Sequence, residues 1–260
     1  MIITLTTDFG LSDPFVGIMK GVILSIAPTV HIVDITHDIR AYDILGAGLI
    51  VNSAYRYFPD GSVHVVIVDP GVGGTRRAIA VASKGHIFVG PDNGLLSVLV
   101  HDEPTTPIVH EITNRQFFLS FVSRTFHGRD IFAPIAAHLA RGVAIDSLGP
   151  RIFDMVKKSV PAPQKKGNKL TAVVMRLDKF GNIITNLRPD HLLAGFKISI
   201  DGMKITRLCA TFSEGKPGEL FAIEGSTGYV EFALNQASAA DRLNVEPGAE
   251  IEVETEVTNQ

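Results

Sequence analysis

Hydrophobic positions in the first half of the chain alternate between strand-like and helix-like spacing. Residues 1–6 form an apolar, β-branched run that ends in a polar turn at residues 7–10. In residues 15–26 the apolar positions recur at helical spacing. Asp13 and Pro14 precede this run, in the order expected of a capping carboxylate followed by a proline in the first helical turn. We therefore predict a strand, a turn and a capped helix.

The same alternation continues along the chain. Residues 31–35 read as a strand, residues 43–58 as a helix, and residues 62–68 as a buried strand that ends at Asp69. Repeated strand–helix units predict a mostly parallel sheet with helices on its faces. Ligands of such sheets bind beyond the carboxyl ends of the strands. Because Asp8 and Asp69 each follow a strand pattern, we expect both at one cleft.

The pattern changes after residue 157. Residues 157–169 read KKSVPAPQKKGNK, a composition typical of a linker. Short β-patterned runs follow at residues 170–177, 182–185, 196–200, 219–223, 229–234 and 249–256, and helical spacing returns only around residues 236–242. This pattern predicts a small antiparallel β domain or barrel. We therefore expect an α/β domain at residues 1–160 and a β domain at residues 168–260.

Composition narrows the classes of protein to consider. Apolar residues make up 45% and charged residues 20%, with a formal net charge of −3, which leaves no basic footprint for nucleic acid or an anionic membrane. The single cysteine, Cys209, excludes an intramolecular disulfide and fits a reducing compartment. The first residues lack the basic start of a signal peptide, and no apolar stretch reaches membrane-spanning length. We expect a cytoplasmic protein.

Asp8 is the first candidate for chemistry. A carboxylate in the turn after a first strand commonly accepts hydrogen bonds from the two hydroxyls of a ribose. An aspartate that only stabilises the turn is the alternative, because Asp favours such positions anyway.

A glycine-rich loop at residues 68–77 carries the second candidate pair. It places Asp69 at a strand end and Arg76 seven positions later, within reach if the loop folds back. The loop lacks both the Gly-Lys-Ser/Thr ending and the GxGxxG spacing of phosphate-binding loops. A flexible connection with a surface salt bridge is the alternative.

His127 is the third candidate. It lies in the polar segment 123–130, beside Gly128 and directly before an apolar helical run at residues 131–139. His37, between Thr36 and Asp38, ranks second among the nine histidines.

Two segments of the second half offer polar edges to a ligand. Residues 178–182 include Asp178 and Asn182, and residues 224–231 form a loop of small residues that leads into a strand. An asparagine side chain both donates and accepts, which suits an adenine or an amino-acid group. A hairpin turn is the alternative for residues 178–182, and a simple β-turn is the alternative for residues 224–231.

Other chemistries find little support in the sequence. No HxH, HExxH or comparable pair indicates a metal site, and we expect none. No GxSxG elbow is present, and Cys209 lies in a β-rich region without a nearby helix start.

Taken in order, the segments resemble one family closely, the SAM (S-adenosyl-L-methionine) hydrolases or SAM hydroxide adenosyltransferases, relatives of the SAM-dependent fluorinase and chlorinase. The matching stretches are TTDFGLSDPFVGIMKGVILSIAP, HIVDITHDIRAYDILGAG, YRYFPDGSVHVVIVDPGVGGTRR, FVGPDNGLLS, TFHGRDIFAP, LDKFGNIITN and EGSTGYVEFALNQASAA. They span nearly the whole chain. The resemblance implies a Rossmann-like N-terminal domain, a C-terminal β-barrel, and a trimer with active sites between subunits.

The resemblance also implies roles for individual residues. An Asp-Arg-His trio that prepares water or hydroxide to attack the ribose C5′ carries over to Asp69, Arg76 and His127, with Arg77 as the alternative arginine. Substrate contacts carry over to the following residues: Asp8, Asp13, Asp178, Asn182, Ser226, Glu231 and Leu234. SAM is then the substrate, and no cofactor is expected.

Two other activities remain open at this stage. Halogenating relatives have a tyrosine where Asp69 stands and a serine where Gly128 stands, and the absence of both here argues against a halide pocket. A non-catalytic sensor of SAM or adenosine is the second alternative. The Asp-Arg-His trio favours hydrolysis of SAM to adenosine and methionine.

Overall fold

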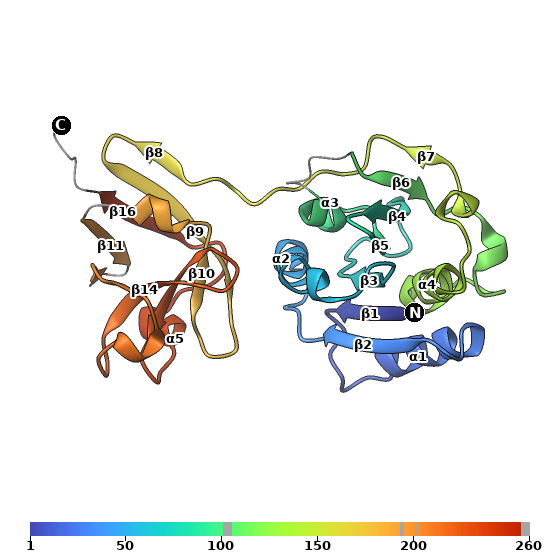
Figure 1. Cartoon of the computed structure of the whole chain (residues 1–260), viewed down its shortest axis with the longest axis horizontal. Coiled ribbons are helices and arrows are strands. Elements are labelled where there is room, and N and C mark those ends of the chain that lie inside the picture. The colour runs from blue at the N-terminus through green and yellow to red at the C-terminus, as the bar shows by residue number, and fades with distance from the viewer. Residues whose placement is uncertain (101–105, 193–194, 201, 256–260) are drawn as a thin grey trace. The chain divides into compact units, whose positions relative to one another are not determined.

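The computed structural model describes residues 1–100, 106–192, 195–200 and 202–255, and the chain divides into two compact units, Met1–Ser159 and Val160–Gln260 (Figure 1). Each unit contains its own large sheet and its own hydrophobic core. The chain therefore has a mixed α/β fold.

The first unit is a seven-stranded sheet between helices (Figure 1). The strand order is β2-β1-β3-β5-β4-β6-β7. Its strands are β1 (Ile2–Thr7), β2 (His31–Thr36), β3 (Val63–Ile67), β4 (Ala78–Ser83), β5 (His86–Pro91), β6 (Ile108–Glu111) and β7 (Arg151–Ile152). Its helices are α1 (Phe15–Ile26), α2 (Ile44–Ala54), α3 (Leu95–Val100) and α4 (Ala133–Ala140), with short turns η1 (Tyr55–Tyr57), η2 (Arg115–Phe117), η3 (Gly128–Phe132) and η4 (Ile145–Leu148).

The two faces of this sheet bury separate cores. Met19 of α1 and Ile135 of α4 pack with Leu5 and Val65 on one face. On the other face, Val51 of α2 packs with α3 and with Val66 and Phe88. Val65 and Val66 serve opposite faces because successive strand side chains alternate. This alternation explains why both neighbours are apolar.

The expectation of a mostly parallel sheet is correct for only part of it. Strands β2, β1, β3 and β5 are parallel, whereas β4, β6 and β7 pair antiparallel. For β4 and β5 the cause is the two-residue turn between them, in which Lys84 (φ 53°) and Gly85 (φ 77°) both adopt positive φ. Such a turn matches the twist of an antiparallel hairpin and returns the chain at once. Sequence patterns did not reveal it.

The predicted cap of the first helix is wrong. Pro14 occupies the N-cap position of α1, whose end has no side-chain cap, and Asp13 lies exposed one residue further out. At that position its carboxylate does not reach the first free amides of the helix. By contrast, Asp43 caps α2 by accepting from the amide of Gly46 at 2.8 Å.

The second unit is built around a sheet of nine strands. The order along the sheet is β12-β11-β16-β9-β10-β15-β14-β13, with β8 paired to β9, and among the described strands only β13 and β14 are parallel neighbours. The strands are β8 (Gln164–Lys166), β9 (Lys169–Leu177), β10 (Ile183–Thr185), β11 (Phe196–Ile200), β12 (Met203–Ile205), β13 (Leu208–Cys209), β14 (Leu220–Glu224), β15 (Val230–Leu234) and β16 (Glu250–Thr255). Helix α5 (Ala239–Leu243) and the turns η5 (Pro189–Leu192) and η6 (Phe212–Glu214) complete it.

The predicted linker at residues 157–169 is partly a hairpin. Residues 164–166 form β8 and pair with the start of β9 across a turn at Gly167, where φ is 65°. All three residues of β8 are exposed and polar. The strand therefore lacks the alternation of apolar and polar residues by which a strand is recognised in a sequence. The predicted run at residues 249–256 corresponds to β16, and Glu256 lies outside the described residues.

Within the residues that the structure describes, no helix combines the length and apolar character needed to cross a membrane.

Candidate functional site

Asp69, Arg76 and His127 form one hydrogen-bonded group in the first unit. Asp69 follows β3, and Arg76 precedes β4. The Nε of Arg76 lies 3.0 Å from each carboxylate oxygen of Asp69, and its Nη2 donates to Oδ2 as well. The same Nη2 lies 2.8 Å from Nδ1 of His127. The guanidinium therefore bridges a carboxylate and an imidazole, with side-chain exposures of only 11% for Arg76 and 5% for Asp69.

The glycine-rich loop brings Arg76 back to Asp69. Two tight turns, Val72 N to Asp69 O and Gly74 N to Gly71 O, reverse the chain. Gly73 has a φ of 75°, and a Cβ at this position would lie 2.0 Å from the carbonyl oxygen of Arg124. The loop thus packs directly on the segment that carries His127, and only glycine allows that approach.

The electrostatics favour a neutral imidazole at His127. Burial lowers its pKa, and the positive charge of Arg76 lowers it further, against smaller opposing effects of Asp69, of Asp130 and of a hydrogen bond with the backbone of Ser123. A guanidinium can only donate, so Nδ1 must accept from Arg76 and the ring proton must sit on Nε2. His127 thus carries its N–H donor at Nε2.

A buried aspartate holds the segment around His127. His127 precedes the π-helical turn η3, in which Asp130 is fully buried. Its carboxylate accepts from Arg129 Nε at 2.6 Å and from Ser123 N and Oγ at 2.8 and 2.7 Å. Burial alone would raise the pKa of Asp130, but these hydrogen bonds hold it below its usual value. Sequence analysis selected segment 123–130 but assigned no role to Asp130 or Ser123. Neither the burial of Asp130 nor its hydrogen bonds to Ser123 can be read from the order of residues.

The two adjacent arginines face different partners. Arg77 contacts the buried Asp92 through Nε at 2.9 Å and the exposed Asp154 through Nη1 at 2.8 Å. Arg76 is therefore the arginine that joins Asp69 and His127.

Asp8 lies at the same sheet edge as Asp69. Strands β1 and β3 are parallel neighbours, with Thr7 opposite Ile67, so both aspartates leave the sheet side by side. One carboxylate oxygen of Asp8 accepts from the amide of Tyr42 at 3.1 Å. The next residue, Phe9, packs its ring edge-on against the ring of Phe126, with the ring centroids 6.0 Å apart.

His37, the second-ranked histidine, supports this turn. It is buried, its Nδ1 lies 2.8 Å from Thr7 Oγ1, and its carbonyl accepts from Gly10 N. It therefore contacts the Thr7 side chain before Asp8 and the Gly10 backbone after it. Asp13 lies exposed beyond the turn.

In the second unit, Asp178 and Asn182 are joined to each other. Asp178 accepts from the amides of Phe180 and Asn182 and from the Nδ2 of Asn182, at 2.8, 2.9 and 2.8 Å. These bonds close a turn, as the alternative interpretation of this segment expects.

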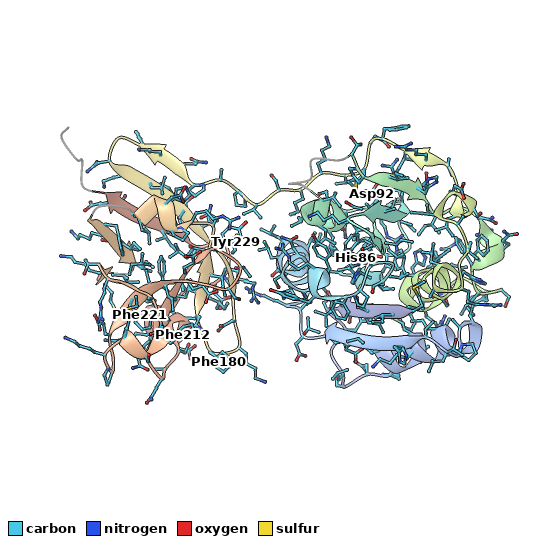
Figure 2. The ribbon with its side chains drawn as sticks, in the orientation of Figure 1. His86, Asp92, Phe180, Phe212, Phe221 and Tyr229 are labelled. Carbon is cyan, nitrogen blue, oxygen red and sulfur yellow. The ribbon has the colours of Figure 1, made fainter. Side chains whose placement is uncertain are left out.

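The remaining candidates of the second unit lie in and before β15. Glu231 is half-buried, and burial followed by the charge of Asp178 raises its pKa. Ser226 is exposed in the preceding turn, and the side chain of Leu234 is buried in the core. Sequence reasoning missed Arg188, whose guanidinium lies 3.7 Å from the ring centroid of Tyr229 (Tyr229 is labelled in Figure 2).

Among the described residues, no three His, Cys, Asp or Glu side chains gather in an arrangement that would hold a metal ion.

The chain matches both domains of one protein family. Residues 3–149 match the SAM hydroxide adenosyltransferase N-terminal domain, and residues 172–252 match the C-terminal domain. The chain belongs to the SAM hydroxide adenosyltransferase family.

Several relatives match the chain over nearly its full length. An (R)-S-adenosyl-L-methionine hydrolase of Salinispora tropica is 39% identical over 96% of this chain and 97% of its own. The enzyme of the same name from Thermus thermophilus is 35% identical over 93% and 95%. A fluorinase of Nocardia brasiliensis is 29% identical over 97% and 96%. The crystal structure of an uncharacterized conserved protein from Thermotoga maritima superposes with a TM-score of 0.88 at 35% identity, covering 97% of this chain and 99% of that one.

Proposed function

We propose that this protein hydrolyses SAM to adenosine and methionine by attack of water or hydroxide on the ribose C5′. The observation that carries the proposal is the Arg76 guanidinium, which bridges Asp69 and His127 in a chain whose full-length relatives include SAM hydrolases.

The chemistry requires an activated nucleophile. The sulfonium leaves as a neutral thioether, so its departure needs no general acid. Water, by contrast, has a pKa near 15.7, and hydroxide is scarce at neutral pH. A residue that takes the proton and a cation that stabilises the remaining negative charge overcome this difficulty. No step in this scheme calls for a metal or a cofactor.

The geometry divides these tasks among the three side chains. Arg76 supplies the positive charge. Since Nδ1 of His127 already accepts from Arg76, the imidazole donates through Nε2–H to the nucleophilic oxygen. Asp69 keeps unused lone pairs on both oxygens and takes the proton. Hydroxide and sulfonium neutralise each other's charge as they meet, which a site shielded from water favours.

The other candidates are proposed to bind the substrate. Asp8 lies at the sheet edge of Asp69 and suits the ribose hydroxyls. Asp13 lies exposed in the segment that follows. In the second unit we assign adenine and methionine contacts to the following residues: Asp178, Asn182, Ser226, Glu231 and Leu234. Leu234 would act through its backbone, because its side chain is buried.

The proposed assembly is a homotrimer of subunits that each combine a Rossmann-like unit with a β-barrel unit. In it, each active site joins the first unit of one subunit to the second unit of its neighbour. Such a heterologous contact closes into a ring. The single cysteine supports the cytoplasmic location that we propose.

Incubation with SAM in labelled water, with and without chloride, tests the proposed function. Adenosine that carries the solvent oxygen at the 5′ position, together with methionine, is the expected result. Accumulation of 5′-chloro-5′-deoxyadenosine would indicate a halogenase instead. Recovery of intact SAM from protein that binds it would indicate a sensor.

A further inference from the structure

The turn that follows β5 lies beside both ends of the glycine-rich loop. Strand β5 runs parallel to β3 and antiparallel to β4, with Pro91 opposite Ala78. The carboxyl end of β5 therefore meets the carboxyl end of β3 and the amino end of β4. The two residues that follow, Asp92 and Asn93, are polar and belong to a motif that the proposed chemistry leaves unused.

Asn93 holds the strand end that carries Asp69. Its Nδ2 donates to the carbonyl oxygen of Val68 at 2.8 Å, and Val68 directly precedes Asp69. Its Oδ1 accepts from the amide of Leu95 at 3.2 Å, at the start of α3. The two ends of one amide thus connect the backbone next to Asp69 to a helix.

Asp92 holds the strand start that carries Arg76. Its side chain is 1% exposed and accepts from Arg77 Nε at 2.9 Å and Nη2 at 2.7 Å, and its amide donates to the Arg77 carbonyl at 2.9 Å. Arg77 directly follows Arg76. The second carboxylate oxygen accepts from Val156 N at 2.8 Å (Asp92 is labelled in Figure 2).

We propose that Asp92 and Asn93 are positioning residues for the Asp69–Arg76 pair, each fixing the backbone next to one member. This inference rests on the proposed function of that pair. The loop between the two members contains three glycines and does not by itself fix their separation. Misplacement of a reacting group by about 1 Å costs up to about 100-fold in rate.

The test compares Asn93→Asp with Asn114→Asp. Asn114 makes the same two contacts elsewhere in this unit: its Nδ2 donates to Ser147 O at 2.9 Å, and its Oδ1 accepts from Gln116 N at 3.3 Å. Each substitution removes the donor and keeps the acceptor. For Asn93→Asp we expect kcat for SAM hydrolysis to fall about 10- to 100-fold, with KM within about twofold of wild type. For Asn114→Asp we expect both constants within about twofold of wild type, whatever its effect on Tm.

A second pair of variants covers the case in which Asn93→Asp does not fold. Asp92→Asn weakens the buried contact to Arg77 at unchanged size and should lower kcat about tenfold. Asp154→Asn weakens the exposed contact to the same guanidinium and should leave kcat within about twofold. The inference would be overturned if kcat fell equally in Asn93→Asp and Asn114→Asp, or equally in Asp92→Asn and Asp154→Asn.

A measurement without substrate separates this inference from the proposed function. The ¹⁵N resonance of His127 Nδ1, assigned by its absence in His127→Gln, reports the contact with Arg76. We expect it to shift in Asn93→Asp and to stay in place in Asn114→Asp. An unchanged resonance in Asn93→Asp overturns the positioning role even if wild type hydrolyses SAM. A wild-type protein that releases no adenosine overturns the proposed function, whatever the resonance does.

Discussion

Nη2 of Arg76 and Nδ1 of His127 lie 2.8 Å apart, and this contact determines which imidazole nitrogen carries the proton. Since the guanidinium has no lone pair to offer, the imidazole accepts at Nδ1 and carries its proton at Nε2. Burial and the charge of Arg76 both lower the pKa of His127, which keeps the ring neutral.

The first prediction separates the two nitrogens of His127. An asparagine at this position offers an oxygen in place of Nδ1 and nothing at Nε2, whereas a glutamine reaches the Nε2 position with an N–H. His127→Asn should therefore lower kcat by about 10²–10⁴-fold. The kcat of His127→Gln should be about tenfold higher than that of His127→Asn. Steady-state kinetics with SAM would decide. If asparagine were the better substitute, the donor role of Nε2–H would be wrong.

The second prediction separates chemistry from binding. Asp69→Asn and Arg76→Ala should each lower turnover by about 10²–10⁴-fold and change SAM affinity little. Asp8→Ala should instead weaken binding first, because its carboxylate is assigned to the ribose. Calorimetric titration with SAM and product assays on the same preparations would measure both. A normal Arg76→Ala beside an inactive Arg77→Ala would reverse the arginine assignment.

The third prediction concerns acid stability. His64 is fully buried between Thr4 and His86, and burial, followed by the charge of His86, lowers its pKa to about 3. The unfolded chain binds a proton near pH 6.5 that the folded protein binds only near pH 3. The free energy of unfolding should therefore fall as the pH drops from about 6.5 toward 3, by up to about 1.4 kcal/mol per pH unit from this residue.

Urea unfolding at several pH values would measure that slope. His64→Leu removes the titrating group and should give a shallower slope, whatever its stability at neutral pH. Parallel slopes for wild type and variant would contradict the assignment to His64.

The fourth prediction tests the approach of the glycine-rich loop to the His127 segment. Gly73→Ala should reduce turnover strongly, because the new Cβ would overlap the carbonyl of Arg124 and push the loop away. Gly61→Ala is the matched control, since Gly61 also has a positive φ, 84°, but open space around its missing Cβ. It should cost about 1–2 kcal/mol of stability from backbone strain and leave turnover unchanged. Equal turnover in both variants would contradict the packing role of Gly73.

The fifth prediction concerns assembly. A subunit inactivated at His127 and another inactivated at Asn182 should restore activity when they are refolded together, if each site combines two chains. Random mixing should restore about one quarter of the sites, one half times one half. Activity and native mass spectrometry of the mixture would test this. Mixed trimers without any recovery would rule out shared sites.

The position of Asp8 and Asp69 after strand patterns correctly predicted that the two residues follow neighbouring strands of one sheet. Asp8 and Asp69 each follow a strand pattern, and β1 and β3 are parallel neighbours, so the two aspartates share an edge. The choice between Arg76 and Arg77 remained open because consecutive residues of an extended segment point to opposite sides. Their partners, His127 and Asp92, lie far along the chain, and no local pattern reveals such pairing.

The missed elements have physical reasons as well. Strand β8 consists of Gln and Lys residues and lies exposed, so it resembles a linker in composition. The turn between β4 and β5 was not recognised because Lys84 is a rare residue at positive φ. The assignment of Asp178 and Asn182 to substrate binding stays a prediction, because their mutual hydrogen bonds equally satisfy the simple turn interpretation.

The two-residue turn at Lys84 and Gly85 has a consequence for how this chain can diverge. It sets the register of β4 against β5, and just before β4 Arg76 contacts Asp69 and His127 whereas Arg77 contacts Asp92. A single inserted or deleted residue in the turn would slide β4 by one position and exchange the sides of the two arginines. Arg77 would then face Asp69, and Arg76 would face Asp92. Both the length of this turn and the positive φ of Lys84 and Gly85 are therefore constraints on descendants of this chain.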